Sequence, residues 1–396
     1  MCGLCLPRCP TYQQTLSEAE SPRGRISLMR ALHLEELPLD NTLEKHLNNC
    51  LTCRACEAAC PSGVKYGYLI DQTRQQIYKN TEKNNSIEHF VLFQVLTHRA
   101  YLKLLNITIW LYQVTGLRKL AQILRIFNLS KKATRLDQLL PQAHRPSIFK
   151  AYYAPKNTHK KDITLFLGCA SESFEPNTLR ATIKLLTQLG YGVHIPKKQS
   201  CCGALHQHQG DHETAQHFIK NNTEAFNTQP NPDVISVATG CTSMLSEYNE
   251  HLAQETNWHA LDIMDFLAKE NVLSTAQFKP LKQVIAIHTP CSMNNVLKIK
   301  QLTYQLLSYI PKIQLATLSS NHTCCGAAGS YMLTQPDMAD KLRESKLSDI
   351  QEIAPDIVVS TNIGCAIHIA AGLKKQSKPT PVTHPIELLA QQLIST

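Results

Sequence analysis

Residues 50–61 read Cys50-Leu51-Thr52-Cys53-Arg54-Ala55-Cys56-Glu57-Ala58-Ala59-Cys60-Pro61, which is the spacing C-x2-C-x2-C-x3-C-P. Three cysteines two residues apart can hold three corners of one [4Fe–4S] cubane, and the cysteine before proline reaches the second cluster of a pair. A structural zinc site would take two ligand pairs at a distance from each other. The spacing therefore predicts iron–sulfur clusters rather than zinc.

The N-terminus repeats the end of this run. Cys2-x2-Cys5-x3-Cys9-Pro10 matches it from the second cysteine onward, so the sequence contains seven of the eight thiolates that two cubanes need. The missing cysteine would lie two residues before Met1. We expect the native protein to begin upstream of Met1. The alternative is a true loss, which would leave a three-iron cluster or a water ligand on one iron.

Two ligand sets follow because the last cysteine of each run crosses to the other cluster. The complete set is Cys9, Cys50, Cys53 and Cys56. The set that lacks one thiolate is Cys2, Cys5 and Cys60. Between the runs, Ser21-Pro22 is typical of a helix start, and apolar residues follow at mostly helical spacing. Residues 1–85 are therefore predicted to form a helical ferredoxin-like domain with two [4Fe–4S] clusters.

The remaining eight cysteines form two copies of one pattern. The corresponding cysteines are 122, 123 and 124 residues apart in the sequence, which indicates a repeated domain. The matching elements are Cys169 with Cys291, Cys201-Cys202-Gly203 with Cys324-Cys325-Gly326, and Gly240-Cys241 with Gly364-Cys365. Each copy alternates short apolar strands with helices, which predicts a parallel sheet. We expect an α+β multidomain protein, with α/β CCG domains over residues 161–275 and 282–396 and a helical connector over residues 86–160.

The cysteines of both repeats follow predicted strands, so they should meet at the carboxyl edge of each sheet. Adjacent thiolates do not fit two corners of a regular cubane, but they can hold an unusual cluster or form a redox-active pair. The alternative is a set of inert buried cysteines. The candidate metal ligands are Cys169, Cys201, Cys202 and Cys241 in the first copy, and Cys291, Cys324, Cys325 and Cys365 in the second.

Several histidines stand close to these cysteines in the sequence: His206, His208 and His212 in the first copy, and His322 and His368 in the second. His368 stands at Cys365-x2-His and is a further candidate ligand, whereas His206, His208 and His212 are interpreted as polar loop residues. In the connector, apolar residues from Phe90 and Val91 through Leu111 indicate helices. We interpret this stretch as a packed helical connector, with a docking surface for another subunit or a membrane as the alternative.

Composition narrows the function classes. The chain has 396 residues and 15 cysteines without a secretory signal, which favours a reduced, cytoplasmic protein over a disulfide framework. The net charge of +9 comes from scattered basic pairs, so nucleic-acid binding is not expected. No stretch reaches the ~20 apolar residues of a membrane span, since Leu104–Leu117 is too short.

The sequence resembles the iron–sulfur subunit family of glycolate oxidase (glycolate dehydrogenase) over nearly its whole length. The segments that carry the resemblance are Cys9-Pro10-Thr11-Tyr12, Ser21-Pro22-Arg23-Gly24-Arg25, Cys50-Leu51-Thr52-Cys53-Arg54-Ala55-Cys56, Cys60-Pro61-Ser62-Gly63-Val64 and Cys324-Cys325-Gly326-Ala327-Ala328-Gly329. Subunits of anaerobic glycerol-3-phosphate dehydrogenase and of heterodisulfide reductase share the architecture. In heterodisulfide reductases the CCG pattern can end in C-x2-C, where this chain has Met244 and His368.

The resemblance implies an electron-transfer subunit of an oxidoreductase. Glycolate would be oxidised to glyoxylate at FAD on partner subunits, and this chain would pass the electrons through its clusters toward a quinone-type acceptor. The absence of a G-x-G-x-x-G fingerprint after a strand agrees with FAD being bound elsewhere. Partners would hold this cytoplasmic chain at the inner face of the cell membrane. The rival interpretations are a reductase whose CCG site is itself catalytic and a non-enzymatic, cluster-bearing redox sensor.

Overall fold

The N-terminal region is entirely helical. The computed structural model describes residues 2–80, 93, 95–125, 127, 130–142, 144–145, 147–227, 232–252, 255–374 and 379–394. The first region contains η1 (Leu6–Arg8), α1 (Pro10–Thr15), η2 (Glu18–Glu20), α2 (Pro22–His33), α3 (Asn41–Asn48), α4 (Ala55–Ala58) and α5 (Tyr66–Asn80). As predicted, α2 begins at Ser21-Pro22, where the Ser21 side chain accepts a hydrogen bond of 3.0 Å from the Gly24 backbone N–H. Leu43, Leu47 and Ile70 lie in its small apolar core.

Three helices link this region to the rest of the chain. They are α7 (Arg99–Val114), α8 (Leu117–Ile123) and α9 (Lys131–Leu139). The interpretation of this segment as a packed connector is correct for one face only. Leu102 and Asn106 on α7 are buried, whereas the neighbouring turns expose large apolar side chains. Phe90 and Val91, which opened the predicted helical stretch, lie outside the described residues.

The first α/β domain is built on a sheet of order β1-β3-β2-β4-β5, in which only β1 is antiparallel. Its strands are β1 (Tyr152–Tyr153), β2 (Lys161–Phe166), β3 (Tyr191–His194), β4 (Asp233–Ser236) and β5 (His259–Asp262). Its helices are α10 (Cys169–Phe174), α11 (Pro176–Gln188), α12 (Ala204–Gln207), α13 (His212–Phe226), α14 (Thr239–Ser246), α15 (Tyr248–His251) and α16 (Ile263–Lys269).

The second α/β domain repeats this topology with the parallel order β7-β6-β8-β9. Its strands are β6 (Val284–His288), β7 (Gln314–Thr317), β8 (Ile357–Ser360) and β9 (Val382–Thr383). Its helices are η5 (Ser292–Val296), α17 (Leu302–Leu307), η6 (Ser319–His322), α18 (Tyr331–Thr334), α19 (Pro336–Ile353), α20 (Ile363–Leu373) and α21 (Pro385–Gln392). The shared order of strands supports the repeat that the cysteine spacing indicated.

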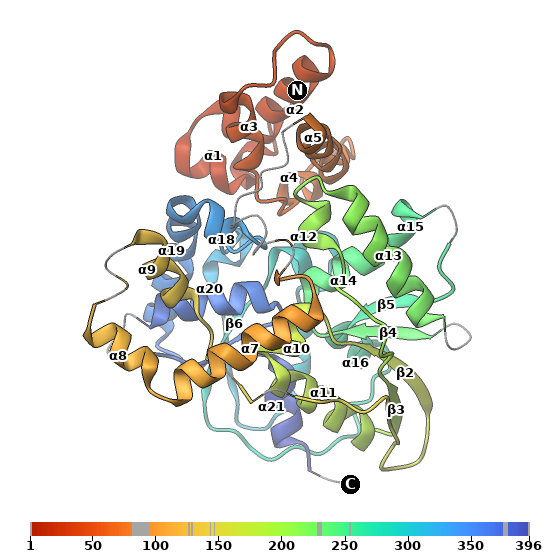
Figure 1. The fold of residues 1–396 in the computed structure, drawn as a ribbon. Coiled ribbons are helices and arrows are strands. Elements are labelled where there is room, and N and C mark those ends of the chain that lie inside the picture. Colours follow the sequence, from red (N-terminus) through yellow and green to blue (C-terminus); the bar gives the residue numbers. More distant parts are fainter. Residues whose placement is uncertain are drawn as a thin grey trace.

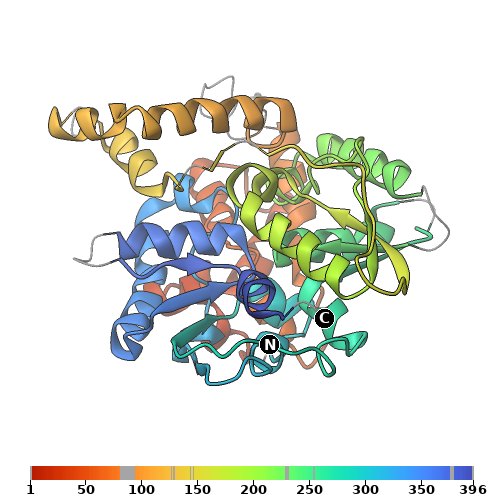
Figure 2. The same cartoon turned by 90° about the horizontal axis from the view of Figure 1, so that it is seen from below.

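The helical N-terminal region and the two α/β domains pack into one body. Helices α1 to α5 lie over the two α/β domains, as Figure 1 shows, and the two sheets lie beside each other in the view from below (Figure 2). Helix α21 of the second domain packs on α11 of the first, so that one apolar core extends through both domains. The carboxyl edges of the sheets also meet, because the Thr239 backbone N–H donates a hydrogen bond of 3.0 Å to the Thr361 carbonyl.

Candidate metal centres

The structure brings together the four thiols of the predicted complete cluster set. Cys9, Cys50 and Cys56 are buried. Burial, followed by repulsion from the neighbouring thiols of Cys50 and Cys9, raises the pKa of Cys56 above its usual value. Cys53 is only partly exposed, and burial, followed by the neighbouring thiols of Cys291 and Cys56, raises its pKa in the same way. Thiols packed this closely carry like charges when ionised, so a cation or a cluster must compensate them.

Polar groups around these sulfur atoms stabilise negative charge. Arg25 is almost fully buried, and its Nη1 lies 3.9 Å from the Cys9 Sγ. The Tyr66 hydroxyl donates to the Cys50 Sγ at 3.6 Å, and the Thr52 backbone N–H donates to the same sulfur at 3.4 Å. Hydrogen bonds to cluster sulfurs tune reduction potentials. This donor set therefore fits an anionic thiolate-bound iron–sulfur cluster.

The second N-terminal set lies nearer to the surface. Cys2 is exposed, whereas Cys5 and Cys60 are half-buried. Burial, then the thiols of Cys2, Cys60 and Cys9, raise the pKa of Cys5, which shows that these sulfur atoms are neighbours. Cys5 is also close to Cys56 of the first set. The two predicted ligand sets therefore adjoin each other, one inside the molecule and one at its surface.

In both α/β domains the cysteines interact in the same two pairs. In the first domain the Sγ atoms of Cys169 and Cys201 are 3.5 Å apart, and Cys202 interacts with Cys241. The corresponding Sγ distances in the second domain are 4.0 Å for Cys291 with Cys324 and 3.0 Å for Cys325 with Cys365. Each domain thus brings together all four of the cysteines that the sequence singled out.

Sheet topology explains this convergence. Cys169 comes shortly after β2, and Cys241 comes shortly after β4. These two strands are adjacent in the first sheet. Cys201 and Cys202 come in the loop after β3, on the other side of β2. The chain goes from β2 to β3 on one side of β2 and then to β4 on the other side of β2. Open α/β sheets bind ligands at such switch points in the strand order. The same arrangement recurs at β6 and β8.

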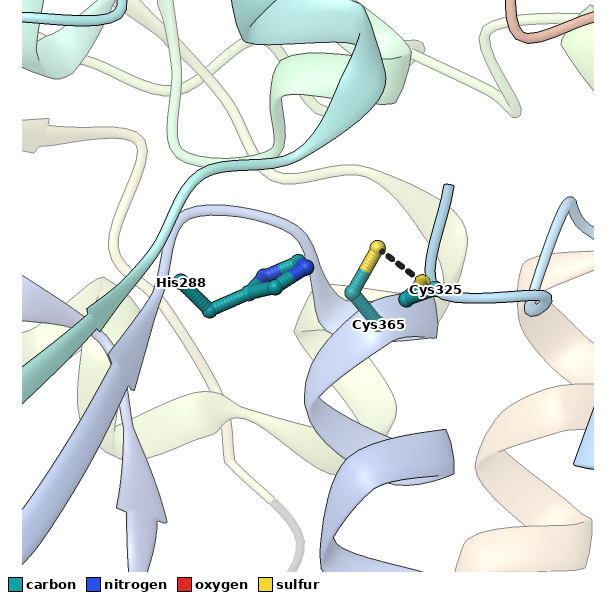
Figure 3. Close-up of side chains that lie close together, drawn as sticks. All are labelled: His288, Cys325 and Cys365. Atoms are coloured by element: carbon teal, nitrogen blue, oxygen red, sulfur yellow. Dashed lines mark hydrogen bonds between the residues drawn. The ribbon is translucent and has the colours of Figure 1, made fainter. Parts of the chain in front are cut away.

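The second domain contains a histidine that sequence reasoning missed. His288, Cys325 and Cys365 are all buried, and their ligand atoms lie within 4.8 Å of one another. Figure 3 shows the imidazole at the end of β6 directed toward the two thiols. Burial, then Lys346, lowers the pKa of His288 to about 3, so the ring is in the neutral form that binds metals. Ser360 Oγ is 3.0 Å from its Nδ1.

The repeat offset could have revealed this residue. His288 stands 122 residues after Phe166, the same offset that relates Cys291 to Cys169. In the first domain Phe166 lies in the apolar cluster that contains Cys201 and Cys202. The two cysteine sites are therefore chemically different, since the second domain has an imidazole, which can bind a metal, where the first has a phenyl ring.

The other histidines agree only in part with their predicted roles: His208 lies in a turn, as interpreted, whereas His212 begins α13. Both ring nitrogens of His368 have partners other than a metal. Arg343 Nη1 lies 3.4 Å from its Nδ1, and the Ala339 carbonyl oxygen lies 3.1 Å from its Nε2. The interpretation of His206 as a loop residue is wrong. It is fully buried in α12, with its Nδ1 2.9 Å from Asp211, because its ring is needed to join this helix to the linker.

The N-terminal region and the second α/β domain meet at their thiols. Cys53 packs with Cys291 and Cys324, and the Asn295 side chain donates a hydrogen bond of 2.8 Å to the Cys53 carbonyl. The Tyr331 hydroxyl donates to the Asn49 carbonyl at 3.1 Å. Three groups of thiols thus follow one another from the surface into the second domain.

Comparison with known protein families matches every one of these regions. A 4Fe-4S dicluster domain matches residues 1–64, a cysteine-rich domain matches residues 163–246 and 285–370, and the linker region of the glycolate oxidase iron–sulfur subunit matches residues 83–140. The probable glycolate oxidase iron–sulfur subunit of Bacillus subtilis is 31% identical over 98% of this chain and 92% of its own length. The chain belongs to the glycolate oxidase iron–sulfur subunit family.

Two further relatives show how much of the chain the similarity covers. The glycolate oxidase iron–sulfur subunit of Escherichia coli is 30% identical over 99% of this chain and 93% of its own length. Lactate utilization protein A of Bacillus subtilis is 27% identical, but over only 57% of this chain. As a member of the iron–sulfur subunit family, the chain has a dicluster domain, which implies two [4Fe–4S] clusters. No helix among the described residues is both long and apolar enough to cross a membrane.

The glycine of each Cys-Cys-Gly motif has a positive φ, which favours glycine, but the two positions tolerate a side chain differently. A Cβ on Gly326 (φ +86°) would lie 2.4 Å from the Ala339 carbonyl oxygen, whereas one on Gly203 (φ +88°) would lie 3.4 Å from that of Ala215. We expect Gly203→Ala to cost about 1–2 kcal/mol of stability through backbone strain alone. Gly326→Ala should cost at least about 2 kcal/mol more, because α19 must move. Thermal unfolding of both variants tests this, and equal losses would contradict it.

Proposed function

We propose that this chain is the electron-relay subunit of a glycolate oxidase complex. FAD-containing partner subunits oxidise glycolate to glyoxylate, and this chain conducts the electrons toward a quinone-type acceptor. Cys9, Cys50, Cys53 and Cys56 hold one cluster, and Cys2, Cys5 and Cys60 hold the other. Bound [4Fe–4S] clusters accept and release one electron at a time, which converts the two-electron chemistry of a flavin into single transfers.

The continuity of the thiol groups carries this proposal. The Cys2, Cys5 and Cys60 set is at the surface, where a partner can approach, and it adjoins the buried set. The buried set ends at Cys53, which packs on Cys291 and Cys324 of the second cysteine-rich domain. Electrons can therefore enter at the surface and leave through the second domain without crossing a long stretch of protein. The names of the relatives supply the substrate, glycolate.

The chain's own residues prepare this route rather than perform bond chemistry. Arg25 holds positive charge beside the buried set and offsets part of the negative charge of its thiolates. Tyr66 fixes the Cys50 sulfur by donating a hydrogen bond to it from its hydroxyl group. Asn295 and Tyr331 hold the N-terminal region on the second domain through its backbone carbonyls. These contacts keep the sulfur groups at a fixed separation during turnover.

Equivalent cysteines in the two repeats give a matched test of the route. We expect Cys291→Ser to lower glycolate-dependent reduction of a quinone analogue by about tenfold or more, which is about 1.4 kcal/mol in the activation barrier. Cys169→Ser, at the corresponding position of the first domain, should have a smaller effect, because no N-terminal thiol packs on it in the described chain. Activity would be measured in the purified complex with its partner subunits.

Two results would contradict the proposed route through the second domain. If the Cys169 variant loses as much activity as the Cys291 variant, the route through the second domain is wrong. In the Cys291 variant, glycolate should still reduce the N-terminal clusters, as followed by EPR, since the break lies beyond them. Clusters that stay oxidised in this variant would contradict the proposed order.

A further inference from the structure

The linker helix α7 exposes an apolar stripe. Its members are spaced three or four residues apart and therefore lie on one face of the helix. They are Tyr101, Leu104, Ile107, Leu111 and Val114, with exposed fractions of 52%, 61%, 39%, 47% and 65%. The opposite face packs on the molecule through Leu102 and Asn106, and Arg99 and Lys103 pair with Glu172 at the edge of that face. The stripe is not part of the protein's own core.

The stripe continues into α8 beyond Gly116. Leu117, Leu120, Ile123 and Leu124 are exposed by 51% to 76%. In the view from below, α7 runs along one edge of the molecule as its outermost element, with both sheets on the same side of it (Figure 2). A ridge of this kind presents its side chains to a flat surface rather than enclosing a ligand in a groove. Exposed apolar patches of this extent mark interaction sites.

The charge of this segment is one-sided. Residues 89–136 contain no Asp or Glu, although they contain eight Lys or Arg residues. Lys119 and Lys131 are exposed, and among the described residues no acid pairs with either of them. Arg118, by contrast, is paired with Asp137 at 2.8 Å, outside the segment. Positive charges with no acidic partner among the described residues therefore flank the apolar stripe in the sequence.

We propose that α7 and α8 lie on the surface of an anionic lipid bilayer. An apolar face with basic residues beside it and no acidic ones is the composition of helices that lie in the membrane interface. Negatively charged headgroups attract Lys119 and Lys131 while the aliphatic stripe enters the acyl boundary. In this arrangement the two helices lie in the plane of the membrane, so the attachment is peripheral. It would hold this chain on the membrane directly, without requiring a partner subunit to do so.

Sedimentation of the full chain with lipid vesicles tests this proposal. We expect binding to phosphatidylcholine vesicles that contain about 30% phosphatidylglycerol, and little binding to vesicles of phosphatidylcholine alone. Lys119→Glu with Lys131→Glu should weaken binding at least about tenfold. Leu104→Gln with Ile123→Gln should weaken it by a similar factor, because the exposed side chains contribute to insertion and not to the core.

Matched controls come from other faces of the molecule. Lys282→Glu with Lys300→Glu makes the same change in net charge at exposed positions, and Tyr304→Gln with Tyr309→Gln removes exposed apolar area. Both double variants should bind vesicles like the unchanged protein. Failure of the unchanged chain to bind anionic vesicles would overturn the proposal, as would equal losses in the control variants. Unimpaired vesicle binding by the linker variants together with loss of the FAD-containing partners would show instead that this face is a protein interface.

Discussion

Replacing Cys53 by serine is expected to lower glycolate-dependent reduction of a quinone analogue by about hundredfold or more, or about 2.7 kcal/mol in the activation barrier. Cys53 belongs to the buried thiol set and also packs on Cys291 and Cys324. Its loss would remove one ligand and the junction to the second domain at once. The EPR signal of the complete cluster should disappear, whereas glycolate should still reduce the flavin of the partner subunits.

Ser62→Ala is the matched control for this substitution. Ser62 is exposed, lies directly after the Cys60-Pro61 dipeptide and is not a candidate ligand. The control should retain both the signal and the activity. If partner subunits without this chain reduce the quinone analogue at the full rate, the relay function is wrong. Normal turnover by the Cys53 variant would contradict the ligand assignment.

Arg25→Ala is expected to destabilise the N-terminal region by about 3–5 kcal/mol, because it removes the arginine of a buried ion pair and leaves Glu20 with His46 and Asn49 as its remaining side-chain partners. Arg25 Nη2 lies 2.5 Å from Glu20 Oε2, and both side chains are almost completely buried. The same guanidinium donates to Thr11 at 3.1 Å and to the His46 carbonyl at 2.8 Å. Its loss should therefore also release iron from the neighbouring thiol set. Thermal unfolding with iron quantification measures both effects.

Arg23 provides the comparison on the same helix. Its ion pair with Glu18 is exposed, with side-chain exposures of 38% and 47%, so Arg23→Ala should lower the stability far less than Arg25→Ala. Iron content should not change in this variant. Equal destabilisation by the two substitutions would show that burial of the Arg25–Glu20 pair is not what stabilises the region.

Local sequence signals predicted most of the architecture because they act over short distances. The Ser21-Pro22 signal placed the start of α2, and the alternation of short apolar strands with helices predicted the parallel sheet of the second domain. Cysteine offsets predicted the repeat, since equal spacing follows from equal topology. Each predicted group of cysteines also comes together in space, which is what strands ending at one sheet edge require.

Features that depend on packing between distant segments could not be predicted in this way. His288 joins Cys325 and Cys365 only because β6 and β8 are adjacent in the sheet. Cys53 meets Cys291, which lies 238 positions later in the sequence, through contacts that no motif encodes. The sequence left open whether α7 is a packed connector or a docking surface, because a periodic apolar pattern predicts a buried face without showing whether the other apolar side chains are covered as well.

Electron flow through the clusters of this chain is tested most directly by freezing the anaerobic complex at intervals after mixing with glycolate and recording EPR spectra. We expect the EPR signals of both N-terminal clusters to appear at least as fast as turnover and to decay when a quinone analogue is added. Clusters that stay oxidised while glycolate is consumed and the quinone is reduced at the normal rate would contradict it.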